Sequence, residues 1–401
     1  MRILHTADWH LGKKLDFYSR LDEQKAVMAE IIQIAEEKAV DMVIIAGDLF
    51  DTFNPPNEAT ELLYKTLKKL AKNGKVPVIA IAGNHDSPDR INVADVLARE
   101  NGIIFIGHPT DKVPLFALED SFEVQKSEVG FIEIKLPQYD YPARILHTAF
   151  ANEVRLKEAF AENKQQALQD SLGKKWTALS KKYCDSQGIN LLTTHLFMAK
   201  SGAEKPEEPD GEKPLNIGNA DVIYSEVLPQ AIQYVALGHL HRYQNIGMHQ
   251  QPAVYSSAPL AYSFSEAGQQ KYVVLAEIEP GKPAEVSRIP LKSGKQLHRK
   301  SFDDVESAIQ WLLENKNALV ELTLATDNFL TAEERKRITQ AHDGIIHLIP
   351  KVKNAGMLAG KAIDIDLSKD ISLLFEDYFT NKEGQSPNKE ILNLFKEILN
   401  S

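Results

Sequence analysis

The stretch Met42-Val43-Ile44-Ile45-Ala46-Gly47-Asp48-Leu49-Phe50-Asp51 decides how this chain folds. Its apolar, β-branched first half predicts a buried strand, and Gly47 with Asp48 marks the carboxyl end of that strand. In open α/β sheets, ligands bind at the carboxyl ends of the strands. We therefore expect Asp48 to lie at the centre of a functional site.

Four further segments repeat this order of an apolar strand followed by polar, ligand-type residues. They are Leu4-His5-Thr6-Ala7-Asp8-Trp9-His10, Val78-Ile79-Ala80-Ile81-Ala82-Gly83-Asn84-His85-Asp86, Leu191-Leu192-Thr193-Thr194-His195 and Tyr234-Val235-Ala236-Leu237-Gly238-His239-Leu240-His241. The repetition indicates that several strand ends contribute to one site.

The polar residues at these strand ends have the chemistry of metal ligands. Two divalent ions about 3.5–4 Å apart can clamp both the attacking and the leaving oxygen of a phosphoryl displacement. Imidazole, carboxylate and amide groups without a thiolate favour Mn²⁺ or a similar six-coordinate ion over a structural zinc. The predicted ligands are Asp8, His10, Asp48, Asn84, His195, His239 and His241.

The spacing within two segments suggests how pairs of ligands are presented. Asp8 and His10 are separated by one residue in a segment that we expect to be extended, so both side chains point to the same side. His239 and His241 repeat that spacing. We expect each pair to face the metals together.

Each part of the pattern has a more ordinary interpretation when taken alone. A single Asp-x-His or Gly-Asp is usually a turn or a solvated pair, and a lone histidine such as His195 is usually a satisfied buried residue. Five segments of this kind, each at the end of an apolar strand, favour the metal site instead.

Composition limits the class of protein. With 401 residues, two or three structural units are expected. The net charge of −10 argues against DNA binding through global electrostatics, so a polyanion must be held locally by metals and a few cations. No apolar run approaches the roughly 20 residues of a membrane helix. The lone Cys184 fits a reducing compartment, and the N-terminus reads as a strand rather than a signal peptide, so a cytoplasmic location is expected.

The order of elements predicts an α/β fold with a doubly wound βαβ core. Residues 1 to about 108 alternate strands with helices, which indicates a parallel sheet. Residues 113 to 136 suggest an antiparallel extension, and residues 144 to 183 look helical and charged. Further strands are expected at Tyr234, Ala253 and Tyr272, and a solvated loop at 203–214.

The remainder of the chain suggests two smaller parts. A boundary near 280 to 300 precedes a small α+β unit of strand, helix, strand, helix and strand. Two amphipathic helices follow the segment Lys353-Asn354-Ala355-Gly356, with Phe375 and Phe395 on their apolar stripes. We expect a first domain at 1–285, a smaller capping domain at 295–352 and a helical pair at 366–401, whose apolar stripes pack either on this chain's own core or on a partner.

These motifs resemble the calcineurin-like metallophosphoesterase superfamily. The residues that carry the resemblance are Asp8-Trp9-His10, Gly47-Asp48-Leu49-Phe50-Asp51, Gly83-Asn84-His85-Asp86, His195 and Gly238-His239-Leu240-His241. Within the superfamily the chain is similar to the SbcD family, the nuclease subunits of bacterial SbcC–SbcD complexes. The specific parts are the segment from Leu4 to Gly12, that from Ala236 to His241, and Tyr262-Ser263-Phe264-Ser265-Glu266. The resemblance spans the whole length and implies a metallophosphoesterase sandwich, a capping domain and C-terminal helices.

The resemblance also implies roles for the site residues. Asp8, His10, Asp48 and His241 would hold one Mn²⁺, and Asp48, Asn84, His195 and His239 the other, with Asp48 as the bridge. His85 would lie near the scissile phosphate as a general acid or phosphate-orienting group, because a histidine can protonate the leaving oxygen near neutral pH. The alternatives for His85 are a group that orients Asn84 or a solvent-facing loop residue.

The implied activity is that of a Mn²⁺-dependent DNA nuclease in repair, recombination and replication. Members of the family degrade duplex ends exonucleolytically, 3′ to 5′, and cut single strands and hairpins endonucleolytically. The implied partner is an SbcC-like ATPase, whose coiled coil is gripped by the C-terminal helices, within a heterotetramer built on a homodimer of the nuclease. No membrane association is implied.

Two departures and two rival functions qualify this assignment. Asp51 stands where archaeal and eukaryotic relatives commonly have a histidine, and Ser257-Ala258-Pro259 stands where the family often has Gly-Ser-Pro. One rival is a phosphatase or small-nucleotide phosphodiesterase on the same fold, although the motifs typical of protein phosphatases are absent after Asp48 and at Asp86. The other is a catalytically silent DNA-end scaffold, against which the complete set of ligands argues.

Overall fold

The computed structural model describes most of the chain. The described residues are 1–158, 163–202, 222–326 and 330–352, together with 374–376, 378–379, 387, 391–392 and 395. The predicted loop at 203–214, the segment 353–356 and most of the predicted helical pair at 366–401 therefore lie outside the described residues. Contacts divide the chain into two units, Met1–Leu324 with Thr331–Ile349, and Ala325–Leu330 with Pro350–Ser401.

The first sheet contains the parallel core that the sequence predicts. Its parallel strands are β1 (Arg2–Thr6), β4 (Met42–Ile45), β5 (Val78–Ile81) and β6 (Ile103–Ile106), connected through α1 (Leu21–Glu37), α2 (Asn57–Leu70), α3 (Pro88–Val93) and α4 (Asp95–Arg99). Two antiparallel strands, β17 (Tyr272–Glu277) and β18 (Glu285–Pro290), complete the order β18-β17-β1-β4-β5-β6. Because β18 pairs along the whole of β17, the sheet continues past the expected domain end at residue 285.

The second sheet has a parallel centre and antiparallel edges. Its centre consists of β10 (Ala143–Thr148), β11 (Ile189–His195), β14 (Tyr234–Gly238) and β16 (Ala253–Tyr255). The edges are β15 (Gln244–Asn245) on one side and β9 (Phe131–Lys135), β8 (Glu123–Glu128) and β7 (Phe116–Ala117) on the other. The last three strands are the antiparallel extension expected at residues 113 to 136.

The expectation that residues 144 to 183 are helical is wrong for their first part. Strand β10 occupies Ala143–Thr148, and the helices α5 (Glu153–Leu156) and α6 (Lys164–Tyr183) come only afterwards. Every residue of β10 is buried, because the strand lies between β9 and β11. The guanidinium of Arg144, the charged residue in this strand, forms a buried ion pair with Glu133 at 3.0 Å.

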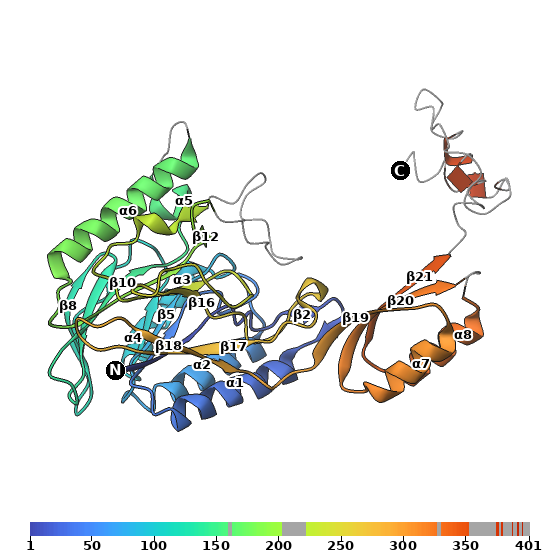
Figure 1. Cartoon of the computed structure of the whole chain (residues 1–401), viewed down its shortest axis with the longest axis horizontal. Helices are drawn as coiled ribbons and strands as arrows, with labels where there is room; N and C mark the ends of the chain where they lie inside the picture. Colours follow the sequence, from blue (N-terminus) through green and yellow to red (C-terminus); the bar gives the residue numbers. More distant parts are fainter. Residues whose placement is uncertain are drawn as a thin grey trace. The chain divides into compact units, whose positions relative to one another are not determined.

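Successive side chains along the strands of the second sheet point to opposite faces of that sheet, and each face packs in a different core. Ile145 and Leu191 belong to a core shared with the first sheet, whereas the next residues, Leu146 and Leu192, pack with Trp176 of α6. The two sheets therefore pack face to face, with α1 and α2 along one outer side and α6 along the other (Figure 1). The predicted two-sheet sandwich is confirmed.

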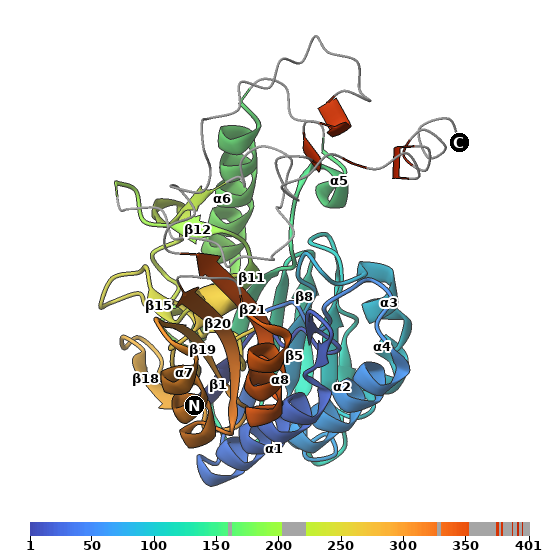
Figure 2. The same cartoon turned by 90° about the vertical axis from the view of Figure 1, so that its right-hand side faces the viewer.

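Residues 296–352 form the small α+β unit, here called the cap. Its elements are β19 (Gln296–Phe302), α7 (Val305–Glu314), β20 (Ala318–Thr326), α8 (Ala332–Ala341) and β21 (Ile345–Val352), in the expected order. Helix α7 begins where the Asp304 side chain accepts the Ser307 N–H, and α8 begins with a capping box at Thr331. Both helices lie on one face of the three-stranded sheet (Figure 2).

The cap shares an apolar cluster with two short segments of the first domain. Leu297, Leu319 and Ile346 pack with Leu15 and Phe264. Those two residues come from the hairpin of β2 (Lys14–Leu15) and β3 (Tyr18–Ser19) and from the 3₁₀ turn η2 (Phe264–Glu266). The other short elements are β12 (Met198–Ala199), β13 (Ile223–Tyr224) and η1 (Ser225–Val227).

None of the helices in the described part of the chain is both long and apolar enough to span a membrane.

Candidate metal centre

The predicted ligands lie at or just beyond the carboxyl ends of five parallel strands. Backbone hydrogen bonds from Asp8 N–H to the Gly47 carbonyl (2.9 Å) and from His10 N–H to the Asp48 carbonyl (3.0 Å) join the first two loops. All of the predicted ligands are buried except Asn84, which is partly buried. Asp8 and His10 follow β1, Asp48 follows β4, Asn84 follows β5, His195 ends β11, and His239 and His241 follow β14.

Four of these residues adopt left-handed backbone conformations. The φ angles are 55° at Asp8, 43° at His10, 50° at Asp48 and 106° at His239. Non-glycine residues in this region carry backbone strain, which is typical of functional sites. The expectation that Asp8 and His10 lie in an extended segment is therefore wrong, because β1 ends at Thr6 and the chain turns before the ligands.

Glycines beside the ligands provide the space for close packing. A Cβ added to Gly47, which has φ of 96°, would lie 2.2 Å from His195 Nδ1. A Cβ added to Gly238 would lie 1.8 Å from the Ala46 carbonyl oxygen. The Gly-Asp and Gly-His sequences thus bring the two sheets into contact at the site.

One group of side chains gathers on the His10 side of Asp48. Candidate ligand atoms of Asp8, His10 and His241 all lie within 4.8 Å of one another. The two Nε2 atoms of His10 and His241 are 3.0 Å apart, and His10 Nε2 is 3.6 Å from Asp48 Oδ2. The geometry is that of several donors directed at one position.

A second group gathers around Asn84 and contacts the same carboxylate. His195 Nε2 lies 3.3 Å from Asp48 Oδ2 and 2.9 Å from Asn84 Oδ1, and His239 Nδ1 lies 3.3 Å from that amide oxygen. His239 therefore belongs with Asn84 and His195, whereas His241 belongs with His10. The expectation that His239 and His241 face the same way is wrong, because the φ of 106° at His239 turns the chain between them.

The electrostatics of the pocket favour a bound cation. Burial raises the pKa of Asp8 despite His195 and His241 nearby. Burial also raises the pKa of Asp48, but the imidazoles of His195, His85 and His10 outweigh it, and this pKa lies well below its usual range. Burial lowers the pKa of His195, but Asp48 and Asp8 outweigh it and raise that pKa to about 9. A cation that binds His195 must therefore displace a proton.

Asp8 carries the clearest sign that a ligand fits. Its Oδ1 accepts the His239 N–H at 2.8 Å, whereas its buried Oδ2 has no hydrogen-bond partner among the described residues. An unsatisfied buried carboxylate oxygen is costly, and a divalent cation with oxygen and nitrogen ligands would satisfy it.

His85 lies beside these groups and is 2% exposed, which excludes the solvent-facing alternative. The backbone N–H of His85 donates to Asp48 Oδ1 at 2.9 Å, and its ring Nδ1 lies 2.8 Å from the Asp51 carbonyl oxygen. The Asp51 carboxylate is 3.7 Å from His10 Nδ1 and 3.9 Å from His85 Nδ1, and it pairs with Lys13 at 2.9 Å. The Asp51 carboxylate thus lies within 4 Å of the rings of both His10 and His85.

Two residues that the sequence analysis did not single out support the site. Asp86 accepts the N–H groups of Leu49, Phe50 and Gly83 at 2.9–3.0 Å, so it fixes the turn that follows Asp48. Arg155 donates to the carbonyls of Gly83 and Asp86 at 2.8 and 2.9 Å. Asp86 stood within a quoted motif, whereas the sequence around Arg155 carries no signal of this contact.

Ser257 resolves one of the two departures from the family pattern. Its backbone keeps a φ of 82°, the region that favours glycine. The side chain compensates, because Ser257 Oγ accepts the Tyr272 N–H at 2.9 Å and lies 3.2 Å from the Tyr272 carbonyl. The turn is therefore retained without glycine.

Comparisons with known proteins agree with this geometry. Residues 1–243 match the family model described as calcineurin-like phosphoesterase. The chain is 34% identical to the SbcD subunit of the SbcCD nuclease of Bacillus subtilis (strain 168), covering 99% of this chain and 97% of that protein. It is 31% identical to the SbcD subunit of the same nuclease of Staphylococcus epidermidis, covering 87% of this chain and 85% of that protein. Similar solved structures include a dimetal phosphatase from Danio rerio, at 12% identity, with 73% of this chain and 99% of that chain covered and a TM-score of 0.37.

Proposed function

Since the chain belongs to the calcineurin-like phosphoesterase family, and within it to the SbcD nuclease subunits, we propose that it is a Mn²⁺-dependent DNA nuclease subunit. It degrades duplex ends 3′ to 5′ and cuts single strands and hairpins. The observation that carries the proposal is the convergence of carboxylates, imidazoles and one amide on both sides of Asp48.

We assign the metal ligands from that convergence. Asp48 would contribute to both metal sites, since its Oδ2 lies 3.6 Å from His10 Nε2 and 3.3 Å from His195 Nε2. Asp8, His10 and His241 complete one site, and Asn84, His195 and His239 complete the other. The mixture of nitrogen and oxygen donors without sulfur supports Mn²⁺.

His85 is the proposed general acid. Two bound divalent ions supply electrostatic stabilisation of the attacking and leaving oxygens of the phosphodiester. With Nδ1 donating to the Asp51 carbonyl, Nε2 of His85 is the atom that transfers a proton to the leaving oxygen. The Asp51 carboxylate stabilises the protonated ring and holds Lys13 beside the site.

The cap is proposed to guide DNA toward the metals. A cavity of about 370 Å³ lies between the β2–β3 hairpin, the η2 turn and the cap, and Asp51 also lines it. Four cations or potential cations line it together with the carboxylates of Asp16, Asp51 and Glu321, and we propose that these cations contact phosphate locally in an otherwise acidic chain. They are Lys13, Lys14, Arg299 and His347.

The C-terminal segment is the proposed docking element for an SbcC-like ATPase with a coiled coil. The names of the relatives identify each as one subunit of an SbcCD nuclease, which supports a partner for this chain. A heterotetramer built on a homodimer of the chain is part of the same proposal. Within the segment, the rings of Phe375 and Phe395 stack with centroids 4.0 Å apart. This contact supports two apolar stripes that face each other in a helical pair.

One assay separates the proposal from its rivals. The chain is incubated with Mn²⁺ and linear duplex, hairpin DNA or a chromogenic phosphomonoester, with Asp48→Asn as the control. Cleavage of DNA by the wild type alone supports the nuclease. Hydrolysis of the monoester without DNA cleavage would favour a phosphatase, and no Mn²⁺-dependent hydrolysis would favour a scaffold.

A further inference from the structure

The segment Tyr262-Ser263-Phe264-Ser265-Glu266 supplies no predicted metal ligand, yet it lies against one. Tyr262 contacts the rings of His10 and His241 edge-on, with centroids 5.6 and 6.1 Å apart. Glu266 is 2% exposed and closes the η2 turn. A buried carboxylate at this place requires an explanation, because burying a charge is costly unless it is paired.

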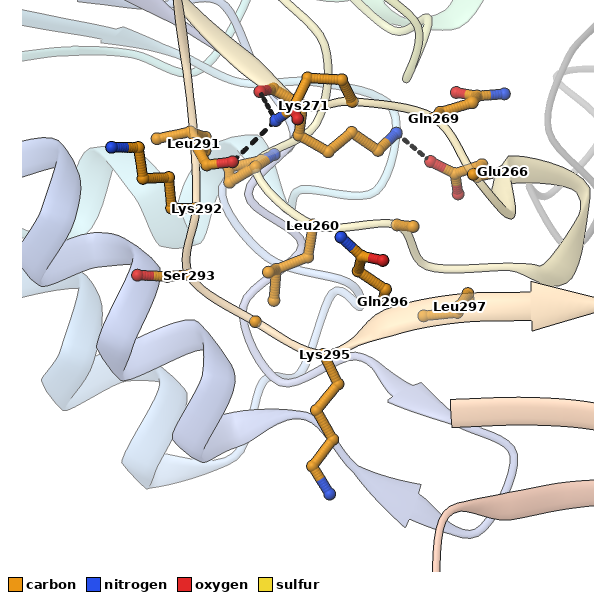
Figure 3. A pocket seen from close by; sticks show the side chains of 15 residues that line it. Leu260, Glu266, Gln269, Lys271, Leu291, Lys292, Ser293, Lys295, Gln296 and Leu297 are labelled. Atoms are coloured by element: carbon orange, nitrogen blue, oxygen red, sulfur yellow. Dashed lines mark hydrogen bonds and ion pairs between the residues drawn. The ribbon is translucent and has the colours of Figure 1, made fainter. Parts of the chain in front are cut away.

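Glu266 makes specific contacts with both of its oxygens. Oε1 accepts the N–H groups of Tyr262 and Ser263 at 2.9 and 3.1 Å and lies 3.4 Å from His241 Nδ1. Oε2 pairs with the ammonium of Lys271 (Figure 3). The carboxylate is thus held by the backbone on one side and by a cation on the other.

The orientation of His241 gives these contacts a function. Its Nε2 faces His10 Nε2 at 3.0 Å, on the side of the metal ligands, so Nδ1 faces Glu266. A histidine that binds a metal through Nε2 must carry its proton on Nδ1, and a carboxylate acceptor selects this tautomer and fixes the ring. The 3.4 Å separation is at the long end of hydrogen bonds, and metal binding strengthens Nδ1–H as a donor.

Lys271 completes the arrangement. It is 6% exposed, and it donates to the His241 carbonyl at 2.8 Å as well as to Glu266. The same lysine therefore contacts both the Glu266 carboxylate and the backbone of His241.

We propose that Glu266 is a positioning residue that orients His241 for metal binding, with Lys271 as its charge partner. The inference rests on the proposed metal centre and adds to it a residue that touches neither metal nor DNA.

The η2 turn holds Glu266 rigidly enough for this role. Ser263 and Glu266 form a capping box, so the turn is fixed at both ends. Phe264, in the middle of the turn, packs in the cap cluster with Leu297 and Leu319. Glu266 therefore contacts the metal ligand from a turn that is anchored in the cap.

The test measures Mn²⁺ binding to the full chain without DNA, by electron paramagnetic resonance of free Mn²⁺. Glu266→Gln preserves the size of the side chain and removes its charge. We expect the affinity for at least one Mn²⁺ to fall 10–100-fold, as is usual when the partner of a ligating histidine is changed. The matched control is Glu133→Gln, which breaks another buried ion pair, at the opposite end of the parallel strands. This control should bind Mn²⁺ like the wild type.

A second variant separates positioning from the effect of an unpaired lysine. Glu266→Gln combined with Lys271→Met has no unpaired buried charge and should still bind Mn²⁺ weakly. Wild-type affinity in this double variant, or an equal loss of affinity in Glu133→Gln, would overturn the proposal. A wild-type chain that binds no Mn²⁺ would instead overturn the metal centre, and these two failures are distinguishable.

Discussion

The contact between Gly238 and the Ala46 carbonyl makes the clearest prediction about how the two sheets build the site. Gly238 ends β14, and His239 follows it directly. In Gly238→Ala the new Cβ would lie 1.8 Å from the Ala46 oxygen and 2.7 Å from His195 Nδ1. Both distances are shorter than those that real Cβ atoms show to their neighbours. Neither neighbouring atom is the flexible end of a side chain, so neither can move away easily.

The magnitude follows from what must move. The Ala46 carbonyl would have to retreat by about 1.6 Å to reach ordinary contact. That carbonyl accepts the His195 Nδ1 hydrogen at 2.7 Å, so its retreat breaks the bond that orients this predicted ligand. Overpacking costs about 1–3 kcal/mol and the lost hydrogen bond about 0.5–1.5 kcal/mol. We expect the free energy of unfolding to fall by about 2–4 kcal/mol and Mn²⁺ affinity to fall about 10–100-fold.

The assay combines urea denaturation with Mn²⁺ titration and cleavage of hairpin DNA. Gly173→Ala in α6 is the matched control, because its Cβ would meet only the Val227 side chain, at 3.2 Å, far from the ligands. The control should change the free energy of unfolding by less than about 1 kcal/mol and leave Mn²⁺ binding unchanged. A Gly238→Ala variant with wild-type stability, Mn²⁺ affinity and cleavage would refute the reasoning.

Three further predictions test the acid, a buried histidine and the docking segment. His85→Ala should retain Mn²⁺ binding while DNA cleavage falls about 10²–10⁴-fold; loss of Mn²⁺ binding in a titration would make His85 a ligand instead. Burial lowers the pKa of His147 from 6.5 to about 4. Below pH 6.5 the unfolded chain binds a proton at this histidine while the folded chain does not, so the free energy of unfolding falls as the pH falls from 6.5 toward 4. The full loss, reached below pH 4, amounts to about 3 kcal/mol, and about 2 kcal/mol of it falls between pH 7 and pH 5. His147→Gln should therefore lose less stability between these two pH values in urea denaturation, and equal acid sensitivity would contradict the prediction. Phe375→Asp combined with Phe395→Asp should abolish co-purification with an SbcC-like partner while Mn²⁺-dependent cleavage and thermal stability persist, and intact partner binding would reject the docking role.

The sequence predicted the location of the candidate site because that location is a local property of the strands. Each ligand follows an apolar run, and parallel strands place their carboxyl ends together, so position along the chain determines position in space. The pairing of ligands was less predictable. His239 and His241 were expected to face the same way, but the backbone turns at His239, and the residue type gives no warning of that φ.

The supporting residues could not be predicted for a different physical reason. Arg155 reaches carbonyls 72 and 69 positions away in the chain, and Glu266 meets His241 across 25 residues. Such contacts depend on how the sheets and turns pack, and neither periodicity nor spacing reports on packing. Arg144 shows the same limit in the fold: residues 144 to 183 were expected to be helical and charged, and only the tertiary contact with Glu133 explains a charged residue in a buried strand.

The burial of the site carboxylates also explains how an acidic chain is compatible with a polyanionic substrate. Asp8, Asp48 and Asp86 contribute to the net charge of −10, yet each is at most 1% exposed. Two divalent ions bound among them would make the local charge positive where the phosphate binds. Some cations line the cap cavity, where Arg299 and His347 both pair with Glu321. Recognition of DNA is therefore expected to depend on the metals and on the cap rather than on the overall field of the protein.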